Sequence, residues 1–334
     1  MRFPDPRVTP LRGGPILRWG ILGPGEIAGD FTATLHANTD QRVHAVASRS
    51  LERAERFAAA NGVPRSYGDY RQLVADPGVD IVYVSSVNSE HRALAELAIA
   101  AGKHVLIEKP IGVDAEDARA IASAARAVGV FATEAMWSRY LPQTDVLRQL
   151  LDAGEFGDVK VVTADFGADF GTDHAAPVFR PELGGGSLRD IGIYPVWFAR
   201  FVLGDPVAIT ARGSWLETGV DAQVAMILET ADGAQAILGT TMLAETAVEA
   251  TISGTLARAE VRSPFLMPDG FDFVRASERS TWTDDSGLRL REGLCWQATA
   301  IARHVTEGLT DSPVHSLDDS IAIMGILDTL RERI

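Results

Sequence analysis

The sequence predicts an α/β domain with a doubly wound parallel sheet, followed by an α+β domain built on an antiparallel sheet. Up to about residue 132, short apolar segments alternate with amphipathic ones of helical length. Beyond residue 150, five strand-like segments follow one another with few helices between them. The 334 residues suffice for two hydrophobic cores. We therefore expect one domain over residues 17–135 and a second over residues 136–334.

The α/β prediction rests on four strand–helix repeats in the first half. The expected strands are residues 16–22, 42–48, 79–86 and 103–108. The expected helices are residues 25–36, 51–62, 89–102 and 114–129. Ser50 and Asp114 are expected to cap two of these helices, and Gly102 and Gly129 to end two. Strands alternating with helices of this length imply right-handed βαβ units and a parallel sheet.

The second half has the pattern of an antiparallel sheet. The expected strands are residues 158–166, 207–216, 221–230, 234–243 and 246–254. Asp232-Gly233 lies between two of them and is a strong hairpin signal. The helices expected to cover one face are residues 141–154, 188–204 and 291–308, and a last helix begins near Leu317. The other face then needs cover, which predicts a homodimer or homotetramer formed through this sheet.

Composition narrows the classes of protein and partner. The chain is 46% hydrophobic and 23% charged, as in globular proteins, and its net charge of −14 argues against nucleic acid or anionic membrane as a partner. A single cysteine, Cys295, excludes an internal disulfide and fits the cytoplasm. Residues 1–16 lack the apolar stretch of a signal peptide, so we interpret them as a flexible arm. The seven histidines show no paired spacing, so we expect no metal site.

A glycine-rich turn, "GPGEIA", follows the first expected strand and opens the first helix. Gly23 permits a tight turn, Gly25 lets the backbone approach a pyrophosphate, and Ala28 permits close helix–strand packing. Glu26 and Ile27 begin the helix, whose free N–H groups and positive dipole end attract phosphate. In this position the motif predicts a dinucleotide-binding Rossmann domain.

The end of the second strand indicates which dinucleotide is preferred. NAD-binding domains usually place a carboxylate there for the ribose 2′-hydroxyl, whereas this chain has Ser48-Arg49-Ser50. A guanidinium between two hydroxyls suits a 2′-phosphate. We therefore predict NADP, with NAD possible. The alternative is a solvated turn whose arginine contacts no ligand.

Four segments together resemble the glucose–fructose oxidoreductase / inositol dehydrogenase (Gfo/Idh/MocA) family of NAD(P)-dependent enzymes: "WGILGPGEIA", "GKHVLIEKP", "EAMWSRYLPQ" and "GGGSLRDIGIYPV". The resemblance runs in order from about residue 17 to the C-terminus. Within the family, the motifs look most like dimeric dihydrodiol dehydrogenases and NADP-dependent D-xylose dehydrogenases. The resemblance implies an oxidoreductase that transfers hydride between nicotinamide and a secondary hydroxyl of a pyranose sugar or cyclic diol.

The resemblance also assigns site residues. The family's Glu-Lys-Pro falls on residues 108–110, which places Lys109 beside the nicotinamide and the reacting hydroxyl, and the family's Asp-x-x-x-His/Tyr falls on Asp190 and Tyr194. The candidate cofactor contacts beyond the two turns are Ser85, Asn88, His91, Glu108, Lys109, Trp137 and Arg139. The candidate substrate contacts are Tyr140, Phe179, Arg180, Asp190 and Tyr194.

The chemistry of Lys109, Asp190 and Tyr194 fits such a reaction. Lys109 follows a parallel strand, and ligands of such sheets bind beyond the carboxyl ends of the strands. Asp190 and Tyr194 are four apart on an expected helix and share a face. Tyrosine, with a pKa of ~10, is a poor base at neutral pH unless a nearby cation stabilises the phenolate, and Lys109 can supply that charge. Asp190 would then bind the sugar or keep Lys109 protonated.

Structural interpretations of the same residues remain open. Lys109 can be a solvated strand end, Tyr194 a helix tyrosine half-buried in the core, and His91 a surface residue. Trp137 and Tyr140 can be core aromatics. Two other functions also stay open: a non-catalytic dinucleotide-binding sensor, and a redox-assisted lyase or glycosidase that retains its cofactor.

Overall fold

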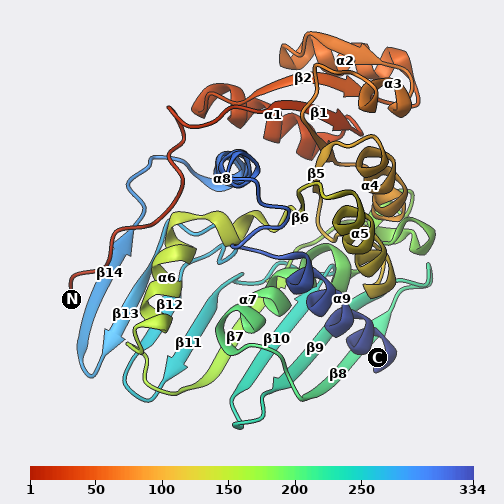
Figure 1. Ribbon diagram of the computed structural model, residues 1–334. Helices are drawn as coiled ribbons and strands as arrows, with labels where there is room; N and C mark the ends of the chain where they lie inside the picture. The colour runs from red at the N-terminus through yellow and green to blue at the C-terminus, as the bar shows by residue number, and fades with distance from the viewer. The chain divides into compact units, whose positions relative to one another are not determined.

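The computed structural model describes all residues, 1–334, and the chain divides into two compact units (Figure 1). The Rossmann unit comprises residues 8–141 and 290–321. The large-sheet unit comprises residues 1–7, 142–289 and 322–334. Each unit is therefore built from separate segments of the chain. The two domains expected from the sequence, by contrast, are each one continuous segment.

The sheet of the Rossmann unit is parallel and doubly wound, as predicted. Its six strands have the order β3-β2-β1-β4-β5-β6. They are β1 (Arg18–Leu22), β2 (Arg42–Ala47), β3 (Arg65–Tyr67), β4 (Ile81–Val84), β5 (His104–Ile107) and β6 (Ala132–Glu134). The strand order reverses between β1 and β4, and a ligand of such a sheet binds at this switch point. The three-residue strands β3 and β6 were not predicted, because so short a segment carries no periodicity.

Helices cover both faces of this sheet. They are α1 (Glu26–Asn38), α2 (Leu51–Asn61), α3 (Tyr70–Val74), α4 (His91–Ala100), α5 (Ala115–Val128) and α8 (Leu294–Thr306). Helix α1 contacts α2 and α8, whereas α4 contacts α3 and α5. The predicted caps of α2 and α5 are confirmed: Ser50 accepts a hydrogen bond from the Arg53 N–H, and Asp114 accepts from the N–H groups of Glu116 and Asp117.

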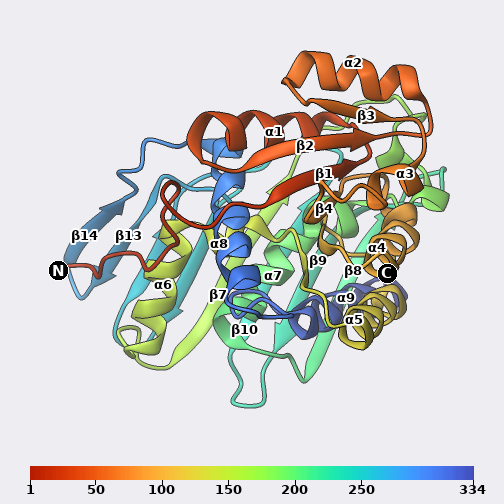
Figure 2. The same ribbon diagram turned by 45° about the horizontal axis from the view of Figure 1, so that its top comes forward.

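Helix α8 is a correction to the sequence analysis. Its apolar face predicted a helix on the second sheet, but it packs against α1 within the Rossmann unit (Figure 2). Its residues 294–302 are all buried. An amphipathic pattern shows that a helix buries a face and does not show against which element.

The large-sheet unit contains eight strands in the order β14-β13-β12-β11-β7-β10-β9-β8. They are β7 (Val159–Gly167), β8 (Ala208–Trp215), β9 (Asp221–Glu229), β10 (Gln235–Thr241), β11 (Ala250–Gly254), β12 (Arg258–Val261), β13 (Gly270–Arg275) and β14 (Glu278–Thr283). The hairpin at Asp232-Gly233 is confirmed: it joins antiparallel β9 and β10, and Gly233 has a φ of 81°. The sheet is nevertheless mixed, because β10 runs parallel to β7.

Four helical elements accompany this sheet. They are α6 (Pro142–Asp152), the π-helical turn η5 (Leu188–Gly192), α7 (Ile193–Leu203) and, from residue 322 on, α9 (Leu317–Glu332), whose first turn belongs to the Rossmann unit. Helix α7 packs on β7 and β10. Along β9 and β10 buried residues alternate with exposed or half-buried ones, so one face of this sheet meets the core and the other is open.

Residues 1–16, which the sequence analysis interprets as a flexible arm, make specific contacts with both units. In the large-sheet unit, the Met1 ammonium donates to Ser280 Oγ at 2.8 Å, and the Phe3 ring meets the Phe271 ring edge-on at 5.5 Å. In the Rossmann unit, the Arg12 guanidinium donates to the Ala37 carbonyl at 2.7 Å. These contacts could not be predicted from the proline- and glycine-rich sequence, because each depends on a partner far along the chain. None of the helices has the length and apolar character that crossing a bilayer requires.

Candidate active site

The glycine turn after β1 is shaped by its close approach to the end of β4. Gly23 has a φ of 102°, and a Cβ there would lie 2.9 Å from the carbonyl oxygen of Ser85. The Ser85 hydroxyl donates to the Gly23 carbonyl at 2.9 Å. Gly25 begins α1 without any side-chain cap, and Ala28 is fully buried beneath it. The turn is therefore a backbone cradle at the switch point, with helix N–H groups available to an anion.

The end of β2 carries cations and no carboxylate. Ser48 is buried and Ser50 caps α2, whereas Arg49 is exposed and lies 3.8 Å from the Glu90 carboxylate. Arg53, which the sequence analysis missed, donates to the carbonyl of Pro24 in the glycine turn at 3.2 Å. Its place in the first turn of α2, just after the Ser48-Arg49-Ser50 turn, was the available signal.

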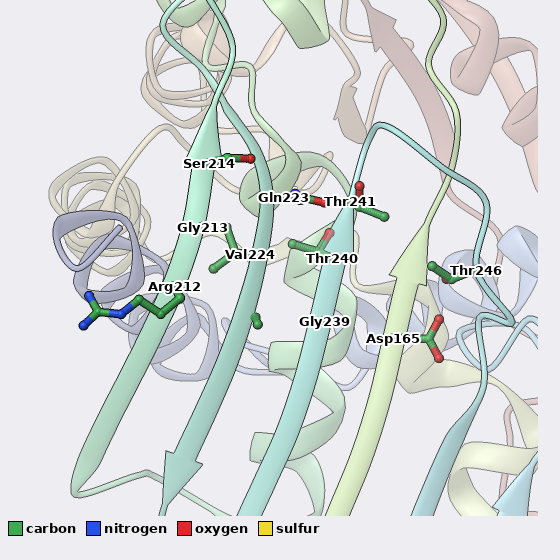
Figure 3. Close-up of a pocket in the computed structure, with 11 residues that line it drawn as sticks. Asp165, Arg212, Gly213, Ser214, Gln223, Val224, Gly239, Thr240, Thr241 and Thr246 are labelled. Carbon is green, nitrogen blue, oxygen red and sulfur yellow. The ribbon is translucent and has the colours of Figure 1, made fainter.

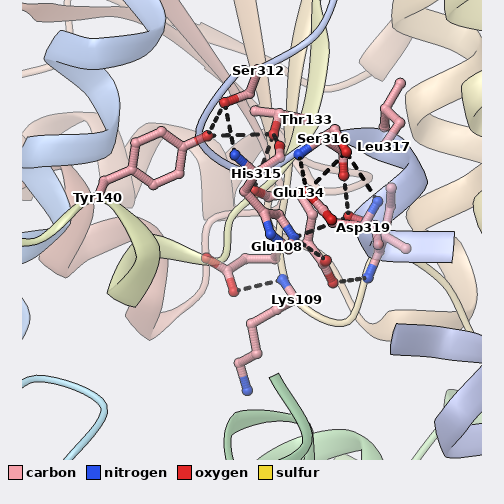
Figure 4. Close-up of polar contacts among 12 residues, drawn as sticks. Glu108, Lys109, Thr133, Glu134, Tyr140, Ser312, His315, Ser316, Leu317 and Asp319 are labelled. Carbon is pink, nitrogen blue, oxygen red and sulfur yellow. Dashed lines mark hydrogen bonds and ion pairs between the residues drawn. The ribbon is translucent and has the colours of Figure 1, made fainter. Parts of the chain in front are cut away.

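The Lys109 segment, residues 108–111, follows β5. The Glu108 carboxylate is buried, accepts from the Tyr83 hydroxyl, and accepts from the Lys109 N–H at 3.0 Å. Burial raises the pKa of Glu108, and the neighbouring Lys109 charge opposes that rise. The Lys109 side chain is half-buried and points away from the polar cluster behind it (Figure 4). Glu108 thus supports the backbone while Lys109 carries its ammonium outward.

His91 corrects one expectation. It is fully buried rather than at the surface, with Nδ1 2.8 Å from the Pro110 carbonyl and Nε2 3.0 Å from the Ser86 carbonyl. Each ring nitrogen thus faces a backbone carbonyl oxygen, and the single N–H of the neutral ring can donate to one of the two. Burial lowers the pKa of His91. Its place is behind the Lys109 segment, as a support for that segment.

Asp190 and Tyr194 lie in the large-sheet unit, on the helix predicted for them. Its first turn, η5, is π-helical, and wide turns of this kind are common at functional sites. Asp190 is half-buried, and Tyr194 is 5% exposed with its ring 6.0 Å from that of Phe166. Asp221 holds the start of the turn: its Oδ2 accepts from the Leu188 N–H at 2.6 Å and from the Ser187 hydroxyl at 2.9 Å.

Of the other candidate substrate contacts, two are buried and one is exposed. The Tyr140 ring is buried and its hydroxyl pairs with Ser312 Oγ at 2.8 Å, as in the core interpretation of this residue. Phe179, a candidate substrate contact, is buried in a small apolar cluster with Val220 and Met242. Arg180 is exposed and forms an ion pair with a neighbouring carboxylate.

Three candidate cofactor contacts follow β4 and precede α6 along the chain. Asn88 and Arg139 are half-buried on short 3₁₀ turns, and Trp137 is buried with its ring 3.2 Å from where a Cβ on Gly293 would stand. The predicted catalytic groups are divided between the units: Lys109 belongs to the Rossmann unit, and Asp190 and Tyr194 to the large-sheet unit. No group of three or more His, Cys, Asp or Glu side chains is arranged to hold a metal ion.

Comparison with known proteins now decides the family. Residues 17–135 match the oxidoreductase family with an NAD-binding Rossmann fold, and residues 144–260 match the GFO/IDH/MocA C-terminal domain. The chain belongs to the GFO/IDH/MocA oxidoreductase family. It is therefore an oxidoreductase with an NAD(P)-binding domain, as the sequence predicted.

Curated relatives of this GFO/IDH/MocA protein match it over almost its whole length. The trans-1,2-dihydrobenzene-1,2-diol dehydrogenase of Xenopus laevis is 35% identical over 330 residues, covering 95% of this chain and 98% of the relative. The enzyme of that name from Homo sapiens is 33% identical over 327 residues, covering 95% and 97%.

Solved structures share the fold. The 3-ketoreductase KijD10 from Actinomadura kijaniata, in complex with NADP and TDP-benzene, has a TM-score of 0.81 at 26% identity, covering 97% of this chain and 98% of that one. Levoglucosan dehydrogenase, in complex with NADH and levoglucosan, has a TM-score of 0.86 at 21% identity, covering 95% and 96%. At that identity the second likeness supports the GFO/IDH/MocA fold alone.

Proposed function

We propose that this protein is an NADP-dependent dehydrogenase that transfers hydride between nicotinamide and a secondary hydroxyl of a cyclic diol or pyranose sugar. The observation that carries the proposal is Lys109, held at the carboxyl end of β5 in a sheet whose switch point bears the Gly23 cradle. The relatives named dihydrodiol dehydrogenase support a diol, and the ketoreductase bound to NADP and a TDP-linked ligand supports a sugar ring.

The residues present fit a dinucleotide. The cradle at Gly23 has no room for a side chain, and the N-terminus of α1 offers backbone N–H groups to the pyrophosphate. Arg49 and Arg53, both exposed near the end of β2, are the groups that would bind a 2′-phosphate. Charge-assisted hydrogen bonds of this kind contribute about 1.5–3 kcal/mol each.

The cofactor preference is tested by Arg49→Ala and Arg53→Ala. Each should weaken NADP binding by about 10-fold or more while changing NAD binding by less than about threefold, because only NADP carries the 2′-phosphate. Isothermal titration with both dinucleotides measures the two affinities. Equal losses for NADP and NAD would contradict the NADP assignment, and the exposed Arg56→Ala on the same helix is the matched control.

The proposed chemistry divides three roles among the chain's residues. In this proposal Tyr194 acts as the phenolate, which accepts the proton of the substrate hydroxyl, and the Lys109 ammonium supplies the positive charge that favours the phenolate and orients the substrate. Asp190 accepts a hydrogen bond from a second substrate hydroxyl. A bound nicotinamide would supply the acceptor for the hydride that leaves the substrate carbon. Solved structures of the KijD10 ketoreductase include one in which a lysine is replaced by alanine and one in which a tyrosine is replaced by phenylalanine. The lysine and the tyrosine of KijD10 are separated along its sequence by almost the same number of residues as Lys109 and Tyr194 here, with a difference of one. This spacing supports the pairing of Lys109 with Tyr194.

Turnover of Lys109→Met and Tyr194→Phe tests these roles. Both should lose about 10²- to 10⁴-fold in turnover, the usual contribution of general acid–base catalysis, with NADP affinity retained. The double variant should lose far less than the product of the single losses, because residues acting as one unit are not additive. NADPH formation with a panel of trans-diols, aldoses and polyols provides the assay.

The same panel separates the other two functions. A folded protein that binds NADP and forms no NADPH with any substrate would favour the non-catalytic sensor. Product formation with a retained cofactor and no net NADPH would favour the redox-assisted lyase or glycosidase. A Lys109→Met change below about twofold, as for ordinary surface substitutions, would contradict the catalytic role of the lysine.

We also propose that the open face of the large sheet pairs with a second copy of the chain, giving a homodimer or homotetramer. Ile227 and Ile237 are paired across β9 and β10 on this face and are 43% and 51% exposed. A shallow hollow of about 460 Å³ lies beside them, where Gly239 and Ala225 leave the sheet without large side chains (Figure 3). Such an apolar pair beside a concave surface suits a self-complementary interface.

Light scattering at micromolar concentration tests the assembly. The unmodified chain should give no dominant monomer, and Ile227→Asp with Ile237→Asp should give one. Val128→Asp, at a residue 50% exposed in the Rossmann unit, is the control that should remain assembled. A monomer in the unmodified chain would contradict the proposal.

The single cysteine is buried and free, which fits a reducing compartment. We therefore infer that the protein is located in the cytoplasm, and cell fractionation checks this location.

A further inference from the structure

Glu134, at the end of β6, is a buried carboxylate that the proposed chemistry does not use. Its side chain is fully buried, yet both oxygens are engaged. Oε1 accepts a hydrogen bond from the Ile111 N–H at 2.8 Å, and Oε2 lies 3.0 Å from His315 Nε2 (Figure 4). Ser320 Oγ lies 3.2 Å from the same nitrogen. Because Oε2 is a carboxylate oxygen, the His315 nitrogen is the donor, and the carboxylate is fixed at both ends.

The backbone held by Glu134 lies two residues beyond Lys109. On the other side of Lys109, Glu108 accepts the Lys109 N–H, and His91 faces the Pro110 carbonyl. One backbone group of each of residues 109–111 is thus met by a side chain: Glu108 of the segment itself, His91 of α4 and Glu134 of β6. A loop has no regular hydrogen-bond ladder of its own, so such contacts fix its course.

Burying a carboxylate has a large desolvation cost, and an apolar side chain of similar size is often as good for stability. A buried carboxylate has an advantage over an apolar side chain where its hydrogen bonds fix the position of a backbone segment that apolar packing alone would not fix. Displacing a catalytic group by about 1 Å can reduce a rate by about 10²-fold. The Ile111 N–H lies close enough in sequence for its anchor to set the position of the lysine.

We propose that Glu134 is a positioning residue for Lys109: through the Ile111 N–H it fixes the backbone that aims the lysine ammonium, with His315 orienting the carboxylate. The inference rests on the proposed catalytic role of Lys109. Glu134 itself contacts neither substrate nor cofactor in this assignment, and it acts only through the Lys109 segment.

Three variants test the positioning role. Glu134→Leu removes both contacts, Glu134→Asp keeps the charge but withdraws it by one methylene, and Glu134→Gln keeps an acceptor for the Ile111 N–H. We expect Glu134→Leu and Glu134→Asp to lower kcat by about 10- to 100-fold while NADP affinity changes by less than about threefold. Glu134→Gln should retain most of the kcat, because the backbone anchor survives.

The matched control is Gln41→Leu. Gln41 is also a buried polar residue of the Rossmann unit, where it accepts from the Leu17 N–H at 3.0 Å and from the Trp19 indole at 3.1 Å. It contacts no residue of the Lys109 segment. Gln41→Leu should lower the Tm as the Glu134 variants do but leave kcat within about twofold, since its effect is on stability alone.

A double-mutant cycle separates the inference from the proposed function. If Glu134 acts through Lys109, adding Glu134→Leu or Glu134→Asp to Lys109→Met should reduce kcat no further. Additive losses, or a kcat for Glu134→Asp equal to that of Gln41→Leu, would overturn the positioning role. If Lys109→Met itself leaves turnover unchanged, the proposed function fails, whatever the Glu134 variants do. Should Glu134→Leu fail to fold, Glu134→Asp carries the same comparison.

Discussion

The Lys109 segment and the helix carrying Asp190 and Tyr194 are both short pieces of chain anchored by a buried carboxylate from a strand. Glu134 on β6 anchors the first, and Asp221 on β9 anchors the second. They differ in everything else that holds them. The Lys109 segment is fixed by individual polar side chains, whereas α7 buries eight of its eleven residues in the apolar core.

The difference follows from backbone hydrogen bonding. A helix satisfies most of its own N–H and C=O groups and leaves only its ends in need of partners, so one acceptor at its start is enough. A loop satisfies few, so each group that is removed from water needs a separate partner. The position of the Lys109 side chain should therefore be sensitive to the loss of a single polar contact. For α7, the loss of apolar packing should lower the stability of the fold instead.

The largest effect on stability is expected for Asp221→Leu. It leaves the buried Leu188 N–H and Ser187 hydroxyl without an acceptor, and each such loss costs about 1–3 kcal/mol. We expect the free energy of unfolding to fall by about 3 kcal/mol or more in urea titrations. Asp285→Leu, at an exposed site of the same unit, should change it by less than about 0.5 kcal/mol. A similar loss for both variants would show that Asp221 is not an anchor.

A smaller loss is expected for Val196→Ala, which tests whether packing holds the helix. Val196 is fully buried in the middle of α7. Removing two methyl groups from such a site costs about 2 kcal/mol, while the helix direction is retained, so kcat should change by less than about threefold. If kcat falls as strongly as in Glu134→Leu, the contrast between the two segments is wrong.

Acid should weaken the Lys109 segment through His91. Burial lowers the pKa of His91 below its ordinary value of 6.5, so the unfolded chain binds a proton that the folded chain resists. The stability due to neutral His91 is present above pH 6.5 and is lost as the pH falls through that value toward the folded pKa. Thermal unfolding across this range should show a smaller fall in Tm for His91→Gln than for the unmodified chain. His174→Gln, at an exposed ring, should leave the fall unchanged.

The smallest effect is expected at Cys295, which reports whether the Rossmann unit opens. Its thiol is buried, and burial raises its pKa to about 11. A thiol with that pKa is almost fully protonated near neutral pH and therefore unreactive. Ellman's reagent should not label the folded chain, and Glu134→Leu should remain as protected as the unmodified chain. Rapid labelling of that variant would mean global loosening instead of a local shift at Lys109.

The parts of the fold that could be predicted are those with a local signal. The βαβ rhythm, the caps at Ser50 and Asp114 and the turn at Gly233 each depend on a few adjacent residues. The missed features depend on distant ones: β10 pairs in parallel with β7, and α8 packs on α1. Neither pairing leaves a trace in the periodicity of either partner.

The candidate site follows the same division. Motifs pointed to Lys109, Asp190 and Tyr194, because short patterns with fixed spacing carry them. Glu134 and Asp221 escaped notice, because a buried carboxylate looks in sequence like any surface carboxylate. The contact of the Tyr140 hydroxyl with Ser312 could not be predicted either, because an aromatic residue near a motif carries no sign of what its hydroxyl faces.

The crowding at Gly23 limits how this domain can be re-engineered. Any side chain there would meet the backbone of Ser85, so the turn is closed to substitution. Arg49 stands on the exposed rim of the same site, where a substitution disturbs no core packing, whereas the exposed Arg53 also donates to the Pro24 carbonyl of the turn. Cofactor choice and fold integrity thus reside in different residues, and a library confined to the rim can search for altered dinucleotide preference without sacrificing the scaffold.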